Sequence, residues 1–314
     1  MHCPTCNVNS PQPHGHFGKN KTPRFRCRQC RRTFSERSVK PCKALNLPDD
    51  TLYRILDCLS EGCSVRSTAR LCDVHISTVL RVLNIAGEKC ERLLQERVRE
   101  VKVKDVQADE LWAFVHCKEK NKRNPNDERQ GDAYTFLAVE RHSKIILAWH
   151  LGRRTKPDTE AFIEKLNEAT RGKFQLTTDG MQAYPDAVSL SLGTRVDYSQ
   201  LIKVYTGMTE GPTRYSPGKL EGTIIEPWIG DPNRDMVCTS HVERVNLTVR
   251  MRMRRLTRLT NAFSRKWDNL KAAVALFVFS YNFREWHRAV RCTPAMAAGV
   301  TGSIWTWKDL FHVN

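Results

Sequence analysis

The chain has 314 residues, 40% of them hydrophobic and 27% charged, which suits a soluble protein with one large domain and one or two small ones. Its formal net charge of +17 favours a polyanionic partner, with nucleic acid ahead of a membrane surface. The start of the chain lacks the apolar run of a signal peptide. The longest apolar stretch, Ala272 to Phe279, is far shorter than the roughly 20 residues that span a bilayer.

Two Cys-x2-Cys pairs, separated by a spacer of twenty residues, stand near the start of the chain: Cys3, Cys6, Cys27 and Cys30. Four thiolates at this spacing can close a tetrahedron around one Zn²⁺, and so short a segment cannot fold on a hydrophobic core alone. The alternative is two redox-active pairs. We predict a zinc ribbon over residues 1–40 with one structural Zn²⁺. The remaining cysteines are scattered singly, which fits a reducing cytosol.

The predicted ribbon is strongly basic, with ten Lys or Arg against the single Glu36 between Lys19 and Lys43. Five arginines crowd the second cysteine pair: Arg24, Arg26, Arg28, Arg31 and Arg32. They either follow the phosphates of DNA or form the solvated surface of a small ribbon, and we favour DNA contact.

After a linker from Pro41 to Pro48, residues 48–88 predict three helices in a helix-turn-helix arrangement. The first helix ends at Gly62, the second runs from Ser64 to Cys72, and the third from Ile76 to Ala86. The third helix would enter the major groove of DNA and present Ser77, Thr78 and Arg81. Small three-helix units also occur without DNA, so the neighbouring basic ribbon supports this interpretation. A charged helix from Glu88 to about Val101 would form a linker over residues 89–104.

Residues 105–300 predict an α/β domain. Val106 to Val115 is rich in β-branched and aromatic residues and predicts a buried strand with Asp109 in its middle. A lone carboxylate in a buried strand is costly unless it is paired or binds a cation. Its neighbour Glu110 should point to the opposite face, because strand side chains alternate. The following elements are predicted as strands at Ala133 to Val139 and Lys144 to Gly152, a helix at Asp158 to Thr170, and a strand at Lys173 to Thr178.

That last strand ends in Asp179-Gly180. An Asp at the end of a strand is where α/β folds place functional groups, although Asp-Gly is also a common turn.

The stretch from Cys238 to Arg258 predicts a long helix with one apolar stripe, formed by Val242, Val245, Val249, Met253 and Leu256. Glu243 lies beside this stripe, and eight basic residues with no acidic one follow from Arg244 to Lys266. Such a helix could offer a metal ligand at its start and Arg244, Arg250 and Arg254 to phosphates. Ser240 and Glu243 also fit a capping box, in which Glu243 only caps the helix.

Two other segments have weaker patterns. Residues 207–236 are Gly/Pro-rich and predict a loop insertion, either functional or disordered, whose Tyr215 and Trp228 touch DNA or pin the loop. A mostly apolar helix from Leu270 to Phe283 should pack on the sheet. The polar cluster near its end is structural or close to DNA: Tyr281, Asn282, Arg284 and His287. The tail, 301–314, predicts no function.

The predicted order of elements matches the ribonuclease H plan, which is a mixed sheet with flanking helices. The order is three strands, a helix, a strand, and then a helix, a strand and a later helix. That plan places one acid on the first strand, one after the fourth and one on a downstream helix, where Asp109, Asp179 and Glu243 stand. Three such carboxylates would hold two Mg²⁺ or Mn²⁺ ions about 4 Å apart for in-line phosphoryl transfer.

Over nearly its whole length the chain resembles the DDE transposases of the insertion sequence one family. The resemblance rests on C-P-T-C…C-R-Q-C-R-R-T-F-S, S-V-R-S-T-A-R-L, D-E-L-W-A-F-V at Asp109, T-T-D-G at Asp179, T-S-H-V-E-R-V-N-L-T-V-R-M-R-M-R-R at Glu243, and Y-N-F-R-E-W-H-R-A-V-R-C-T-P-A-M-A-A-G. It implies binding of the terminal inverted repeats, cleavage at the ends of a mobile element and joining of the freed 3′-hydroxyls to target DNA. It also implies a homo-oligomer on double-stranded DNA and a place in the cytoplasm of a prokaryote, at the nucleoid. Arg250 matches a residue that contacts terminal DNA in related transposases, with Arg254 as a second candidate.

Two other functions stay open on sequence grounds. One is a DNA-binding regulator in which the ribbon and the helix-turn-helix do all the work, although such a protein has no need of three acids at these places. The other is a ribonuclease H-like nuclease that cuts DNA without joining it.

Overall fold

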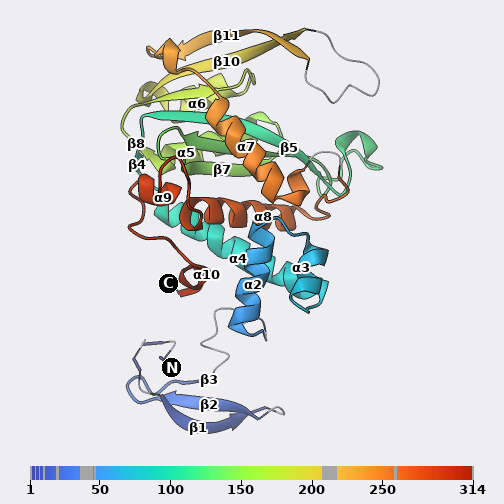
Figure 1. The fold of residues 1–314 in the computed structure, drawn as a ribbon, viewed down its shortest axis with the longest axis vertical. Helices are drawn as coiled ribbons and strands as arrows, with labels where there is room; N and C mark the ends of the chain where they lie inside the picture. The colour runs from blue at the N-terminus through green and yellow to red at the C-terminus, as the bar shows by residue number, and fades with distance from the viewer. Residues whose placement is uncertain are drawn as a thin grey trace.

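A computed structural model describes residues 2–3, 5–6, 8–9, 11–18, 21–35, 45, 47–206, 218–257 and 260–312. Figure 1 shows, along the long axis of the view, a small sheet near the N-terminus, a helical unit, and a larger sheet with its helices. Within the described residues, no helix is both long and apolar enough to cross a lipid bilayer.

The N-terminal sheet has three antiparallel strands in the order β1-β2-β3. They are β1 (Pro11–Phe17), β2 (Thr22–Cys27) and β3 (Thr33–Ser35). Its apolar cluster is small, because Phe34 is the one large side chain buried with Cys3 and Cys27 among the residues described there. Phe25 packs against Phe34, with ring centroids 6.0 Å apart. So small a cluster stabilises little by itself.

The helical unit consists of α2 (Asp49–Ser60), α3 (Val65–Leu71) and α4 (Ile76–Arg97). Apolar side chains expected to face inward are buried in α2 and α4: Leu52, Ile55, Leu56, Val79, Val82 and Leu83. In α3 Ala69 is buried, but Leu71, which was also expected to face inward, is 58% exposed. Ser64 caps α3 by accepting a hydrogen bond from the Ser67 amide, and the His75 ring caps α4 by accepting one from Ser77.

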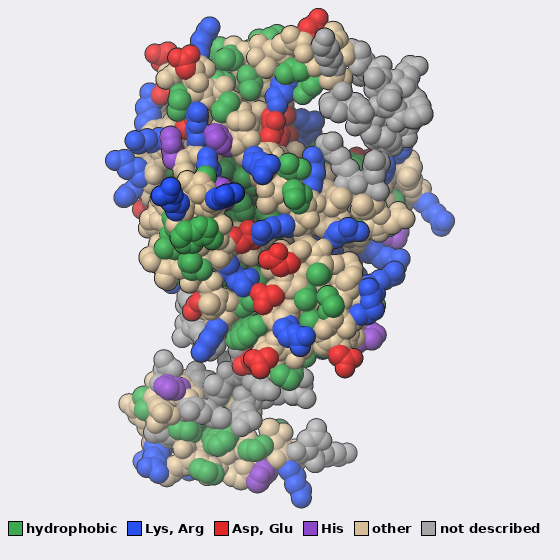
Figure 2. Space-filling model, in the orientation of Figure 1, with side chains coloured by type: hydrophobic (Ala, Val, Ile, Leu, Met, Phe, Trp, Pro, Cys, Tyr) green, Lys and Arg blue, Asp and Glu red, His purple; other side chains and the backbone are tan. Residues whose placement is uncertain are grey.

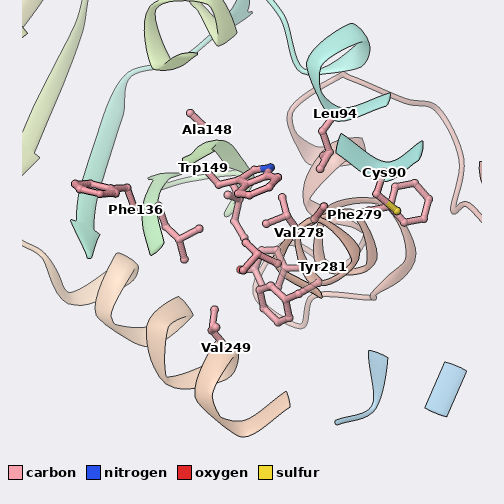
Figure 3. Packing of buried hydrophobic residues seen from close by; sticks show 14 of the residues in the cluster. Cys90, Leu94, Phe136, Ala148, Trp149, Val249, Val278, Phe279 and Tyr281 are labelled. Atoms are coloured by element: carbon pink, nitrogen blue, oxygen red, sulfur yellow. The ribbon is translucent and has the colours of Figure 1, made fainter. Parts of the chain in front are cut away.

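The prediction of two helices over residues 76–101 is wrong, because α4 is one helix of 22 residues. Gly87, at the expected break, is instead a packing residue. A Cβ on Gly87 would lie 2.5 Å from the Cα of Ala272 in α8 (Trp267–Phe279), so only glycine lets the two helices approach this closely. Further along α4, Cys90 and Leu94 lie beside Val278 and Phe279 of α8 (Figure 3). One continuous hydrophobic core therefore joins the helical unit to the sheet.

The central sheet has six strands in the order β11-β10-β9-β5-β6-β7. The strands β5 (Asp105–Val115), β6 (Gly131–Glu140) and β7 (Ile146–Gly152) form an antiparallel meander. Helix α5 (Lys156–Ala169) leads to β9 (Phe174–Thr178), which is parallel to β5, and α6 (Tyr184–Ser191) leads to β10 (Val196–Thr206), which is parallel to β9. Strand β11 (Lys219–Ile229) returns antiparallel to β10. The mixed α/β class is thus confirmed, and the order of elements agrees with the prediction from β5 to β10.

The remaining elements are β4 (Val101–Lys102), β8 (Thr170–Arg171), η1 (Glu119–Asn121), η2 (Gly193–Arg195), η4 (Arg234–Met236), α7 (Ser240–Arg252), η5 (Arg254–Leu256), the π-helix η6 (Ser280–Arg284), α9 (Pro294–Ala297) and α10 (Trp307–His312).

The two faces of the sheet carry different helices. On one face, Phe136 of β6 packs against Phe162 of α5. On the other, Asp109 of β5 is hydrogen-bonded to Asn246 of α7.

The prediction of a loop over residues 207–236 is wrong for residues 219–229, which form β11. Thr223, Ile224 and Ile225 favour a strand, and Pro227, which has no N–H to donate, is tolerated because β11 is an edge strand. Residues 207–217, and with them Tyr215, lie outside the described residues. Trp228 is 52% exposed and does not pin the segment.

The basic helix is shorter than predicted. Helix α7 ends at Arg252, and Met253 has an extended backbone (φ −115°, ψ 95°). The Thr257 hydroxyl donates a hydrogen bond of 2.7 Å to the Arg250 carbonyl, which satisfies a free acceptor of the last turn. Met253 and Leu256 remain buried with the apolar stripe, so the burial was predicted correctly while the helix end was not.

The polar cluster near the end of α8 has structural roles where its contacts are described. Asn282 is fully buried and bonds both the amide and the carbonyl of Ile146 in β7. Arg284 pairs with Asp57 of α2 at 2.9 Å and lies 3.8 Å above the ring of Trp307. These contacts tie the C-terminal segment to the sheet and to the helical unit.

Candidate metal centres and nucleic-acid interface

Asp109 and Asp179 are brought together by the register of two parallel strands. The pairing of β5 with β9 ends at Ala108 opposite Thr178, so the next residue on each strand is an aspartate. After β9 the chain turns, with the Met181 amide donating to Oδ1 of Asp179 at 3.1 Å. The two carboxylates therefore lie side by side at one edge of the strand pair.

Asp109 is held by two hydrogen bonds. Its Oδ1 accepts from the Glu110 amide at 2.8 Å, and its Oδ2 accepts from Nδ2 of Asn246 at 2.7 Å. Burial, and after it the negative charge of Asp179, raise the pKa of Asp109 to about 6, and the charge of Glu243 adds to this. The ionised form of Asp109 is therefore unfavourable in free energy unless a cation lies near it.

Glu110 is the third member of the cluster and was missed from the sequence. It faces Tyr184 of α6, opposite the α7 side that holds Asp109, so the predicted alternation is correct. Even so, one oxygen each of Asp109, Glu110 and Asp179 lie within 4.8 Å of one another. The side chain of Glu110 is 4% exposed, and its Oε1 has no hydrogen-bond partner among the described residues. Burial, followed by the charge of Asp179, raises its pKa to about 8.

Arg154 is the cation nearest to this cluster among the described ion pairs. Its Nη2 lies 3.6 Å from Glu110 and 3.5 Å from Asp179. One guanidinium cannot offset three carboxylates, and the pKa of Asp179 is also raised, with burial as the largest cause. Buried, mutually repelling carboxylates with an unpartnered oxygen are the donor set that a hard divalent cation prefers, so these residues fit Mg²⁺ or Mn²⁺.

Glu243 lies outside the 4.8 Å cluster formed by the described residues. It stands in the first turn of α7, and its carboxylate accepts hydrogen bonds from Lys203 of β10 and from the Thr239 hydroxyl. The capping box with Ser240 does not form, because the N-cap is Thr239 and the first turn lacks a side-chain cap bond. The charge of Glu243 contributes to the raised pKa of Asp109, so Glu243 lies within electrostatic range of that carboxylate.

The four N-terminal cysteines converge as their spacing predicted. Sγ of Cys3 lies 3.5 Å from that of Cys30, Sγ of Cys6 lies 3.5 Å from that of Cys27, and all four atoms lie within 4.8 Å of one another. They form no disulfide. Sulfur atoms bound to one zinc at about 2.3 Å would stand about 3.8 Å apart, so the group fits tetrahedral Zn²⁺.

Backbone amides favour thiolate at two of these cysteines. The Thr5 amide lies 3.4 Å from Sγ of Cys3. Burial opposes ionisation of Cys3, but the amides of Thr5 and Cys6 and the side chains of Cys30 and Cys6 outweigh it and lower its pKa to about 6. At Cys6, the Val8 amide favours ionisation, but burial and the three neighbouring cysteines outweigh it and raise the pKa to about 12. The Cys30 amide lowers the pKa of Cys27. Thiolates are the form of cysteine that binds zinc.

The basic residues predicted to contact DNA are accessible. In the ribbon, Arg24 is half-buried and bonded to Thr33, and the others are exposed: Arg26, Arg28, Arg31 and Arg32. At the start of α4, Ser77 and Arg81 are exposed and Thr78 is half-buried, while on α7 and after it Arg244 and Arg254 are exposed and Arg250 is half-buried. Figure 2 shows Lys and Arg side chains over both the helical unit and the larger domain.

These features define a class: a basic α/β protein with a four-cysteine cluster, a helix-turn-helix-like unit and an acidic centre on neighbouring strands. No family model matches the chain. The insertion element iso-IS1N protein InsA of Shigella dysenteriae is 32% identical over 83 residues, which are 26% of this chain and 87% of InsA. The chain belongs to the insertion sequence one family, as the motifs predicted, on a match that spans 26% of its length.

Three solved structures are more remote. A pre-cleavage Mos1 transpososome is 12% identical at a TM-score of 0.20, over 48% of this chain and 58% of that one. The Mos1 strand transfer complex is 13% identical at a TM-score of 0.22, over 73% of this chain and 76% of that one. Endonuclease V from Bacillus subtilis is 11% identical at a TM-score of 0.23, over 59% of this chain and 86% of that one. TM-scores this low carry no argument about fold or function.

Proposed function

We propose that the protein is a DDE transposase that binds the terminal inverted repeats of its element and catalyses metal-dependent DNA cleavage and strand transfer. The observation that carries this proposal is that Asp109 lies beside Asp179, and it is supported by the contribution of the Glu243 charge to the raised pKa of Asp109. A ribonuclease H-like core is supported by the antiparallel meander β5-β6-β7 extended by the parallel strands β9 and β10. A DNA-binding regulator would need none of these acids.

In this proposal Asp109 and Asp179, which belong to the acidic cluster, would hold two divalent ions together with Glu243, which lies outside that cluster. When bound, such ions supply an activated water or 3′-hydroxyl and stabilise charge on the leaving oxygen. The protein's own side chains prepare the ligands. Asn246 fixes one oxygen of Asp109, whereas Glu243, bonded to Lys203 and Thr239 at the start of α7, would have to leave Lys203 to bind metal. Asn246 and Glu243 share one helix, which sets the spacing between these two ligands.

DNA binding is assigned to the parts before the core. In this proposal the zinc ribbon (1–40) and the helix-turn-helix (48–88) recognise the element ends, a linker (89–104) joins them to the catalytic domain (105–300), and 301–314 is a tail. The ribbon's thiolates would hold one structural Zn²⁺, and its arginines would contact phosphates. The protein would act as a homo-oligomer of at least two copies, because two element ends are joined, in the cytoplasm of a prokaryote.

The test is cleavage of DNA that carries the flanks of the protein's own coding region, with Mg²⁺ or Mn²⁺. Asp109→Asn should abolish nicking, while the DNA dissociation constant stays within about twofold of wild type. The matched control is Asp231→Asn, which changes an exposed acid between β11 and α7, and this variant should nick DNA normally.

Undiminished nicking by Asp109→Asn would reject the assignment. Nicking without joined product, when target DNA is supplied, would favour a nuclease that does not transfer strands. Binding without any nicking by the wild type, at any divalent metal tested, would favour the regulator.

A further inference from the structure

A cavity of about 540 Å³ lies between the helical unit and the segment that follows α7. One wall comes from the turn between α2 and α3 and from α4, another from residues 252–255, and a third from residues 260–265 and α8. This volume is in the range of sites that enclose a small molecule. The cavity shares no residue with either metal centre.

The cavity is strongly cationic. Its described lining residues include five arginines and no Asp or Glu: Arg66, Arg252, Arg254, Arg255 and Arg265. The charge of Arg252 is offset by an ion pair with Glu285. Arg66, Arg254 and Arg265 are exposed and so can turn toward a ligand.

Arg255 is a partly buried cation of this cavity whose described side-chain hydrogen bond goes to a neutral group. Its Nη1 donates a hydrogen bond of 2.8 Å to Oγ of Ser264, a neutral group that is itself buried. Burial lowers the pKa of Arg255 to about 10, with no carboxylate contributing. A largely buried guanidinium is costly unless an anion accompanies it.

The other walls are apolar, with Leu80, Phe263, Leu276 and Phe277 among the residues that form them. A bare phosphate would use the arginines and leave these walls without a partner. A nucleotide has both an anionic phosphate and a flat base, which stacks on aromatic side chains whatever its sequence. Paired DNA is too wide for a cavity of this volume, so the nucleotide must be unpaired.

The position along α7 is consistent with DNA. From Glu243 to Arg252, the last residue of α7, the helix advances nine residues, or roughly 14 Å at 1.5 Å per residue. One DNA strand covers that distance in about four nucleotides at 3.4 Å each, and Arg254 follows two residues later. A strand leaving the acidic site along this helix would reach the cavity.

We propose that this cavity binds one unpaired nucleotide of the DNA substrate, with its phosphate against Arg254, Arg255 and Arg265 and its base against Phe263. The inference rests on the proposed function and deepens it, because it adds a place where a frayed or cut strand end is held. It predicts that the protein distinguishes DNA with unpaired ends from blunt duplex.

The test uses the full-length protein without added divalent metal and fluorescence anisotropy at one fixed salt concentration, because salt alone changes affinity. Two labelled DNAs share one sequence, and one of them carries a five-nucleotide single-stranded overhang. Wild type should bind the overhang DNA about tenfold more tightly than the blunt duplex.

The double variant R254Q/R265Q should lose most of this preference. The matched control R123Q/R171Q removes the same charge from exposed positions outside the cavity, and it should weaken binding of the two DNAs equally. Phe263→Leu should weaken binding of the overhang DNA by about tenfold and leave blunt duplex unchanged.

An unchanged preference in R254Q/R265Q, or equal affinity of wild type for the two DNAs, would overturn the proposal while leaving the transposase assignment intact. Failure of wild type to bind either DNA would instead count against the proposed function itself.

Discussion

Gly87→Ala tests the contact that fixes the helical unit to the catalytic domain. The new Cβ would lie 2.5 Å from Cα and Cβ of Ala272 and 2.8 Å from its carbonyl oxygen. Ordinary carbon contacts are about 3.5–4.0 Å, so α4 and α8 would have to separate by about 1 Å. Two backbone atoms are among the contacts, and no side-chain rotation can relieve them.

Two effects compete in this variant. Replacing glycine by alanine inside a helix stabilises by about 1 kcal/mol when nothing opposes it. Overpacking a filled core typically costs about 1–3 kcal/mol, and parting the helices also loosens Cys90 and Leu94 against α8. The difference between these two effects is a net loss of about 0–2 kcal/mol in the free energy of unfolding, and because backbone must move we expect the upper part of this range.

The assay is urea unfolding followed by circular dichroism, with Glu88→Ala as the control on the exposed face of the same helix. The control should change stability by no more than about 0.5 kcal/mol. An increase in stability of Gly87→Ala would refute the close packing of α4 on α8.

Three further predictions concern the site and its support. Cys27→Ser should release the bound zinc and weaken DNA binding, measured by metal analysis and anisotropy, whereas Cys292→Ser, away from the cluster, should change neither. Asn246→Ala should slow cleavage by about ten- to a hundredfold at unchanged DNA affinity, because Asp109 loses its orienting donor; an unaltered rate would show that this hydrogen bond does not matter. Burial raises the pKa of Asp105 above its ordinary value of 3.8, against the opposing effect of Arg141, so the folded state binds more protons and stability should fall as pH rises through the raised pKa. In Asp105→Asn, thermal unfolding midpoints should show a shallower fall as pH rises above about 4, and an identical slope would contradict this.

Local patterns predicted the parts of the structure that local chemistry decides. The spacing of the four cysteines predicts the two Cys-x2-Cys pairs of a metal site without reference to the rest of the chain. The helical period of apolar residues likewise predicts that Val242 and Val249 lie in the core. Burial of Met253 and Leu256 was also predicted, although the helix that carried the prediction ends at Arg252.

What could not be predicted depends on contacts between distant segments. Gly87 looks like a helix break in sequence, and only the approach of Ala272 reveals its packing role. Alternation separates Glu110 from Asp109 by face, but Asp179 stands at the strand end, where it meets both. Strand β11 was hidden because its hydrogen-bond partner, β10, precedes it across a Gly/Pro-rich stretch.

The central claim is that Asp109, Asp179 and Glu243 bind divalent metal together. The most direct measurement is anomalous scattering from crystals of the protein grown with Mn²⁺. The account predicts manganese within about 2.0–2.3 Å of oxygens from all three residues. Manganese held by Asp109, Glu110 and Asp179 with Glu243 still on Lys203, or no manganese at these residues, would contradict it.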